Sequence, residues 1–181
     1  VFHNPAGLAF LEGTQISLGT TLILPRSSLA LPNWPDSRYK TVKQENQVFY
    51  PSTFYIAHRF GERLAAGFGF FSPYGLGTKW PKDYPLRYIV TSDDMKTFFF
   101  NPVIAYKASD NLSFGLGVSY IHATLNLDLV QYLVIWDVPA SLKASGNAFG
   151  FNAGALYKKD KFSLGVNFRS GFDLKYSGDI K

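Results

Sequence analysis

The side chains that could carry out chemistry are few and far apart in this sequence of 181 residues. His3, His58 and His122 have no spacing that would bring them together as metal ligands. Asp93 and Asp94 are adjacent, but neighbours on an extended chain point to opposite sides and cannot share acid and base roles. Cysteine is absent, so no thiolate or disulfide is available. We therefore expect no enzyme, no metal site and no cofactor.

Phosphate and nucleic-acid chemistry are also poorly represented. The glycine-rich stretches lack the Lys-Ser/Thr ending of a phosphate-binding loop, and no Gly-x-Ser-x-Gly motif occurs. The net charge is +5, but Lys and Arg are scattered and form no basic stripe interleaved with stacking aromatics. We expect no nucleic-acid partner.

Apolar and aromatic side chains are abundant instead. The chain is 46% hydrophobic and has 17 Phe and 11 Tyr against one Met, a composition that favours strands. No run approaches the roughly 18 apolar residues that a membrane helix needs. The chain starts without a methionine and without a secretory signal, and we interpret it as a mature or truncated segment.

Large apolar and small polar residues alternate with a period of two along most of the chain. The pattern is clearest where Leu112, Phe114 and Leu116 alternate with serine and glycine. Seven strands are expected, over residues 15–24, 53–60, 64–78, 96–107, 112–120, 149–157 and 162–168. Residues 171–181 could extend the last strand.

The connections alternate between short and long. Tight turns near Glu62, Asp110 and Asp160 are nearly evenly spaced, and long connections cover 25–48, 80–95 and 128–145. Short periplasmic turns and long extracellular loops are typical of outer-membrane barrels. The polar face carries mostly Ser, Gly and Ala instead of Lys, Glu and Thr, which favours a transmembrane antiparallel β-barrel over the alternative of a soluble sandwich or lipocalin-like barrel.

Seven strands cannot close an antiparallel bacterial barrel, which needs an even number. An open edge in a bilayer would leave backbone N–H and C=O groups unpaired. We therefore expect the chain to be part of a larger all-β barrel, completed by further sequence or by a partner.

Three segments resemble the FadL/TodX family of outer-membrane transporters for fatty acids and hydrophobic compounds. They are Asn-Pro-Ala-Gly at 4–7, Phe-Ser-Pro-Tyr-Gly-Leu-Gly-Thr at 71–78 and Ser-Phe-Gly-Leu-Gly at 113–117, with support from 150–157. The resemblance implies a fourteen-stranded barrel with an N-terminal hatch. Residues 1–13 would be the end of a mostly missing hatch and its junction with the barrel. Residues 14–181 would be the first half of the barrel, with about seven strands.

The resemblance also assigns roles to individual residues. Asn4, Pro5 and Ala6 would form the hatch junction, the alternative being a plain turn before a strand. Pro73 and Gly75 interrupt a segment that is otherwise strand-like, because Pro removes a ladder donor, so a bulge or kink is expected. In the family this strand bends inward and opens a lateral gap, a role carried here to Ser72, Pro73, Tyr74 and Gly75. The alternative is that the strand ends at Ser72.

The connection 128–145 is unusually apolar for an exposed loop, which is typical of a binding or membrane-contact surface. Together with residues of the connection 80–95 it could form a shallow groove that captures ligand. The residues expected to capture ligand are Trp80, Tyr84, Leu86, Tyr88, Leu129, Tyr132, Leu133, Val134 and Trp136. The alternative is that the two loops only pack on each other.

The function that these features predict is passive uptake of long-chain fatty acids or hydrocarbons across the outer membrane of a Gram-negative bacterium. The partners would be the apolar ligand, outer-membrane lipid and lipopolysaccharide. One departure from the family favours a neutral ligand: Asn126 to Leu129 lacks the basic residue expected there for a carboxylate, although Arg169 could compensate. A general porin, a structural or adhesive barrel, and an outer-membrane lipid hydrolase or acyltransferase are the alternatives.

Overall fold

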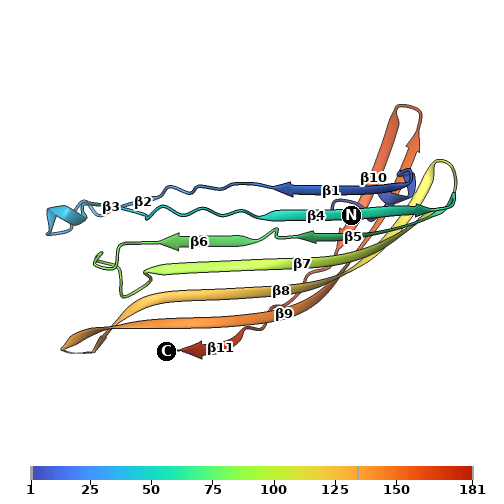
Figure 1. Ribbon diagram of the computed structural model, residues 1–181. Coiled ribbons are helices and arrows are strands. Elements are labelled where there is room, and N and C mark those ends of the chain that lie inside the picture. Colours follow the sequence, from blue (N-terminus) through green and yellow to red (C-terminus); the bar gives the residue numbers. More distant parts are fainter. Residues whose placement is uncertain (1, 134, 181) are drawn as a thin grey trace.

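A computed structural model describes residues 2–133 and 135–180, most of which lie in one strongly curved antiparallel sheet (Figure 1). Seven strands follow one another across this sheet: β1 (Thr14–Thr20), β4 (Ser52–Phe60), β5 (Leu64–Phe71), β7 (Ser92–Lys107), β8 (Leu112–Leu133), β9 (Trp136–Lys159) and β10 (Phe162–Arg169). Each strand is antiparallel to the next. The expected all-β fold with seven strands is confirmed.

Four shorter strands and two short helices complete the described part of the chain. β6 (Gly75–Lys79) pairs with β7 beyond the end of β5, and β11 (Ser177–Ile180) pairs with β9 beyond the end of β10. β2 (Ser28–Ala30) and β3 (Thr41–Lys43) form a small separate sheet. The helices are short 3₁₀ turns, η1 (Pro5–Phe10) and η2 (Ser37–Tyr39). No helix among the described residues is long and apolar enough to cross a bilayer.

The two ends of the sheet differ in the way that the sequence predicts. The short turns β4–β5, β7–β8 and β9–β10 lie at one end, and the long connections lie at the other (Figure 1). β1 is shorter than expected: after Thr20 only an isolated bridge joins Ile23 to Phe49. Pro51 lies in this stretch and has no N–H to contribute to a ladder, which accounts for the early end.

The segment 128–145 is not the irregular loop that the sequence analysis expects. β8 continues to Leu133 and β9 begins at Trp136, so the segment is a β-hairpin with Val130 opposite Pro139. The β-branched and aromatic residues that made this segment look like an apolar loop are also those that favour paired strands. The other two long connections keep their loop character except for β2, η2, β3 and the first residues of β7.

The sheet has two chemically different faces, because side chains alternate between them along each strand. We call the face covered by the N-terminal segment the inner face and the opposite face the outer face. On β8, Ser113, Ser119 and Ile121 are buried on the inner face, whereas Leu116 and Val118 are exposed on the outer face. The outer face continues over the neighbouring strands with Phe60, Ile104, Phe114, Phe151, Leu164 and Phe168, all exposed. A continuous apolar surface of this extent fits contact with lipid.

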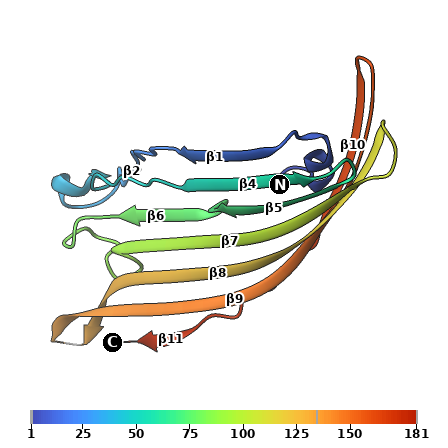
Figure 2. The same ribbon diagram turned by 45° about the vertical axis from the view of Figure 1, so that its right-hand side comes forward.

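Small side chains on the inner face leave room for the N-terminal segment, which packs across several strands (Figure 2). Leu8 and Ala9 of η1 form a buried core with Ala57, Ala65 and Val103 of the sheet. This core is thin, because the wall contributes mostly alanine and valine to it.

Gly115 on β8 and Gly154 on β9 are paired across the two strands. Because neither has a side chain, they form a shallow depression, here called the seat, in which the backbone of the N-terminal segment lies. A Cβ at Gly115 would lie 2.5 Å from the Pro5 carbonyl carbon, and a Cβ at Gly154 would overlap the Asn4 side chain. Any larger residue at either position would therefore push the segment off the wall.

We expect Gly115→Val to detach the start of η1. Overpacking of a tight contact should lower the free energy of unfolding by about 1–3 kcal/mol, measured by urea titration of the full-length protein in detergent. Gly7→Ala is the matched control, since a Cβ there has no atom within 4 Å. Equal stability of the two variants would contradict the assignment of Gly115 as a seat.

Candidate functional site

The first residues of the chain are tied to the inner face by side-chain hydrogen bonds. Asn4 Nδ2 donates to the carbonyls of Ala155 (3.1 Å) and Val166 (3.2 Å), on β9 and β10, while its Oδ1 accepts from Ala6 N (2.9 Å) and caps η1. Ser113 Oγ donates to Ala6 O at 2.9 Å. Asn4, Pro5 and Ala6 are thus more than a turn before a strand: they begin a 3₁₀ helix bound to the wall. Their assignment as a hatch junction stays a prediction.

Arg169, the last residue of β10, holds the segment at Phe2. Its Nη2 donates to Phe2 O at 2.6 Å, and its guanidinium carbon lies 4.6 Å from the centre of the Phe2 ring. The Phe71 ring is 5.9 Å away, so the cation is bordered by two aromatic rings. None of the ion pairs among the described residues includes Arg169. Next to it, Asn167 Nδ2 donates to His3 O.

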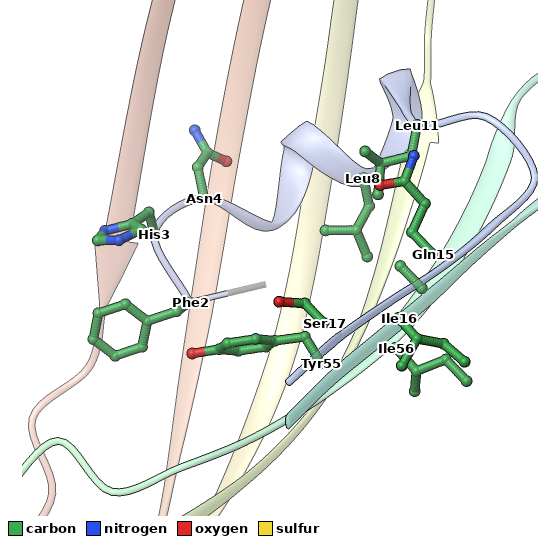
Figure 3. A pocket seen from close by; sticks show the side chains of 11 residues that line it. Phe2, His3, Asn4, Leu8, Leu11, Gln15, Ile16, Ser17, Tyr55 and Ile56 are labelled. Carbon is green, nitrogen blue, oxygen red and sulfur yellow. The ribbon is translucent and has the colours of Figure 1, made fainter. Parts of the chain in front are cut away.

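A cavity of about 490 Å³ lies between the N-terminal segment and strands β1 and β4. Figure 3 shows Phe2, His3 and Leu8 on one side and Ser17 and Tyr55 on the other. The remaining lining residues are Asn4, Leu11, Gln15, Ile16, Ile56 and Ala57. A mostly apolar lining with a few polar groups is typical of sites for small hydrophobic ligands.

The wall is interrupted at Ser72–Tyr74, between β5 and β6. Phe71 pairs with Phe99 and Gly75 pairs with Lys96, so three residues lie opposite the two residues Thr97 and Phe98. This one extra residue makes a bulge. The strand resumes at Gly75 against the same neighbour, so the alternative that it ends at Ser72 is wrong.

Thr97 stabilises the interruption. Its N–H and its Oγ1 both donate to Tyr74 O, at 3.1 and 2.6 Å, and Tyr74 N lies 3.2 Å from the same Oγ1. One hydroxyl thus substitutes for part of the missing ladder. Nothing in the sequence distinguishes Thr97, because threonine is common in strands.

An aromatic cluster on the inner face joins the interruption to the cavity. Phe71 stacks on Phe99 (centroids 5.4 Å apart), and Phe99 lies 6.0 Å from Tyr74 at the break. In the other direction Phe71 contacts Phe2 at 4.8 Å and Tyr55 at 6.1 Å, both of which line the cavity. Apolar surface is therefore continuous from the cavity to the break.

At the far end of the sheet, residues 80–91 form a compact loop. Trp80 stacks on Tyr84 with centroids 5.7 Å apart, and Trp80 N donates to Thr91 O at 2.8 Å. The Tyr84 ring is buried and its hydroxyl donates to Val90 O. Burial raises the pKa of the Tyr84 hydroxyl.

This loop is fastened to the β8–β9 hairpin by Arg87. Arg87 Nη2 lies 3.0 Å from Asp137 Oδ2, and Tyr88 donates its hydroxyl to Asp137 Oδ1 at 3.0 Å. Val130 N donates to Arg87 O at 2.9 Å. Desolvation raises the pKa of Tyr88, and its hydrogen bond to Asp137 raises it further. Arg87 and Asp137 were not singled out from the sequence, although opposite charges in two loops expected to meet were a usable signal.

The structure brings together some of the loop residues expected to capture ligand. Tyr88 lies edge-on to Tyr132 at 6.2 Å, and Leu133 pairs with Trp136 at the hairpin tip. Tyr132, Leu133 and Trp136 are exposed, whereas Leu86 and Leu129 are half-buried. Val134 lies outside the described residues. None of these loop residues lines the cavity described above, so a capture groove stays a prediction.

Comparison with known proteins decides the family. The whole chain, residues 1–181, matches the family model described as outer membrane protein transport protein (OMPP1/FadL/TodX). The chain belongs to this family. The family and the outer-membrane localisation expected from the sequence are thereby confirmed.

This FadL/TodX family member is 26% identical over 208 residues to the long-chain fatty acid transport protein of Escherichia coli O6:H1, covering 100% of the chain and 46% of that protein. It is 27% identical over 194 residues to a 47 kDa outer membrane protein of Pasteurella multocida, covering 98% of the chain and 44% of that protein. The chain spans about half the length of the curated relatives it matches.

Solved structures agree on the fold of this FadL/TodX family member. The Pseudomonas putida toluene transporter TodX superimposes with a TM-score of 0.73 at 18% identity, over 95% of the chain and 50% of TodX. A Pseudomonas aeruginosa FadL homologue gives 0.69 at 17% identity, over 93% and 46%. At these identities the likeness concerns the fold alone. The expected number of fourteen strands stays a prediction.

We expect Arg87→Met to loosen the loop in this FadL/TodX family member. Amide hydrogen exchange in residues 84–91 should accelerate about two- to fivefold, since an exposed ion pair contributes about 0.5–1 kcal/mol. Lys107→Met is the control, because the Lys107–Asp110 pair lies at the opposite end of the sheet. Unchanged exchange in 84–91 would show that the backbone bond from Val130 holds the loop without Arg87.

Proposed function

We propose that the full-length protein takes up small hydrophobic molecules through the outer membrane and releases them sideways through the wall. The observation that carries this proposal is the interruption at Ser72–Tyr74, which borders an aromatic cluster continuous with an apolar cavity. A ligand in the cavity would pass Phe2 and Phe71, then Phe99, and leave beside Tyr74 for the lipid.

Such a route needs no covalent step and no coupled energy source. Apolar ligands leave water for the apolar surface and then for the lipid, both in the direction that the hydrophobic effect favours. The exposed apolar outer face supports lipid, including lipopolysaccharide, as the surroundings of the exit. We place the exit at Ser72, Pro73, Tyr74 and Gly75.

The state of Arg169 favours a neutral hydrocarbon over a fatty acid. Its Nη2 is engaged by the Phe2 carbonyl and its charge is bordered by two rings, so a carboxylate would have to compete with the N-terminal segment for it. The E. coli relative is named a long-chain fatty acid transport protein and TodX a toluene transporter. We favour the second chemistry for this chain.

The rival functions fit less well. A general porin needs a water-filled channel lined by charge, whereas the inner face here is covered by η1 and lined largely by Gly, Ser and Ala. A structural or adhesive barrel gives no reason for the interruption at Pro73. An enzyme would need a nucleophile and a base, and the described residues of the inner face show no such pair.

Capture would begin at the hairpin tip. Tyr132, Leu133 and Trp136 expose apolar surface next to the loop 80–91, which the Arg87–Asp137 pair holds in place. Ligand adsorbed there would be concentrated at the mouth of the barrel. Trp80, Tyr84, Leu86, Tyr88, Leu129 and, outside the described residues, Val134 complete the proposed capture surface.

Deletion of Pro73 tests the lateral route. Removing one residue brings Ser72 and Tyr74 opposite Phe98 and Thr97 and restores a continuous strand. We expect the initial rate of toluene uptake by cells to fall at least about tenfold, with the barrel still folded as judged by heat-modifiable migration. Pro73→Ala is the matched control, because it keeps the extra residue and the bulge. Undiminished uptake after the deletion would overturn the route.

Trp136→Ala tests capture. Loss of an aromatic contact of about 1 kcal/mol should reduce uptake about fivefold at low toluene concentration and leave the saturating rate unchanged. Phe162→Ala, an exposed aromatic at the opposite end of the sheet, is the control. If both variants behave alike, the hairpin tip has no part in capture.

A further inference from the structure

The wall has a second interruption, which no sequence motif predicts. Arg169 pairs with Asn152 and Ser177 pairs with Ser145, so the seven residues Ser170–Tyr176 lie opposite the six residues 146–151 of β9. One hydrogen-bonded position persists at its start: Ser170 N donates to Phe151 O and Phe151 N donates to Ser170 Oγ, both at 2.9 Å. Figure 2 shows the trace between β10 and β11 without strand structure.

This segment lies over the inner face of β9. Gly146 shares its face with the buried residues Ala148 and Asn152, and a Cβ at Gly146 would lie 2.7 Å from Lys175 O. The backbone near Lys175 therefore occupies the space that a side chain at position 146 of β9 would fill. The extra residue is taken up by an inward excursion of the chain.

The excursion places two apolar side chains against the aromatic cluster. Phe172 and Leu174 pack on the buried residues Phe71, Phe99, Ile121 and Ala148. The Phe172 ring is edge-on to Phe99, with centroids 5.6 Å apart and an interplanar angle of 75°. Asp173, between them, is exposed.

The two interruptions thus meet at one ring. Phe99 lies 6.0 Å from Tyr74 of the first and 5.6 Å from Phe172 of the second. A ligand that passes Phe99 on its way to Ser72–Tyr74 would therefore come within contact distance of Phe172. Apolar contacts hold Phe172 in this position. Because its own segment between β10 and β11 is not paired as a strand, a small displacement of Phe172 breaks no ladder hydrogen bond.

We propose that Phe172 determines specificity by setting the width of apolar ligand that can pass Phe99. The proposal rests on the lateral route described above. Slender molecules, such as single-ring hydrocarbons or straight chains, pass with the Phe172 ring in place or slightly displaced. Bulky branched hydrocarbons of the same polarity are excluded.

The test compares uptake of toluene and of 1,3,5-triisopropylbenzene by cells making the full-length protein. Phe172→Ala should raise the ratio of bulky to slender uptake about tenfold, with toluene uptake changed less than twofold. Phe172→Leu, which keeps most of the apolar contact, should give an intermediate ratio. Phe168→Ala, exposed on the outer face of β10 just before this segment, is the control. An unchanged ratio in folded Phe172→Ala overturns the proposal.

A second readout separates this proposal from the lateral route. In purified protein free of other cysteines, toluene should slow maleimide labelling of Phe172→Cys at least threefold and leave Asp173→Cys unaffected. If deleting Pro73 stops uptake but neither Phe172 readout responds, the lateral route stands and Phe172 has no role. If deleting Pro73 has no effect, the lateral route fails, and absence of protection at Phe172→Cys then overturns this proposal as well.

Discussion

The structure depends on one constraint: in a bilayer the backbone must satisfy its own hydrogen bonds, because no water is available to replace a missing partner. A wall strand can therefore be interrupted only where something else takes the place of the ladder. In both interruptions a side-chain hydroxyl does so. Thr97 Oγ1 bonds to the backbone of Tyr74, and Ser170 Oγ accepts from the backbone of Phe151. Both side chains, Thr97 and Ser170, are short enough for their hydroxyl groups to reach the neighbouring backbone directly.

The same constraint explains the division of residue sizes between the two faces. Large apolar residues can occupy the outer face freely, because lipid adapts to them. The inner face must accept an N-terminal segment whose own polar groups need partners. It supplies the side chains of Ser113, Asn167 and Arg169 for the carbonyls of this segment, and wall carbonyls for the Asn4 side chain. Where the segment comes closest to the wall, at Gly115 and Gly154, only glycine leaves enough room.

Sequence reasoning recovers the parts that depend on local pattern. Alternation predicts the seven strands and the chemistry of each face, and Pro73 predicts the first interruption, because a proline inside a strand removes a donor. The second interruption escapes prediction: Ser170 to Tyr176 has no proline and alternates Phe172, Leu174 and Tyr176 as a strand would. Only the register of its neighbours reveals the extra residue. The hairpin at 128–145 and the Arg87–Asp137 pair depend on which segments come into contact in the fold. A short stretch of sequence does not show this.

The bond from Arg169 to the Phe2 carbonyl joins residues 167 positions apart. Asn4 likewise needs carbonyls from both β9 and β10. These N-terminal residues therefore cannot reach their final position until the seventh strand is in place. During assembly, binding of the N-terminal segment to the inner face therefore follows the pairing of β9 with β10. While its strands are being inserted, such a wall has an open inner face, and the N-terminal segment can bind there fully only after β10 has paired with β9.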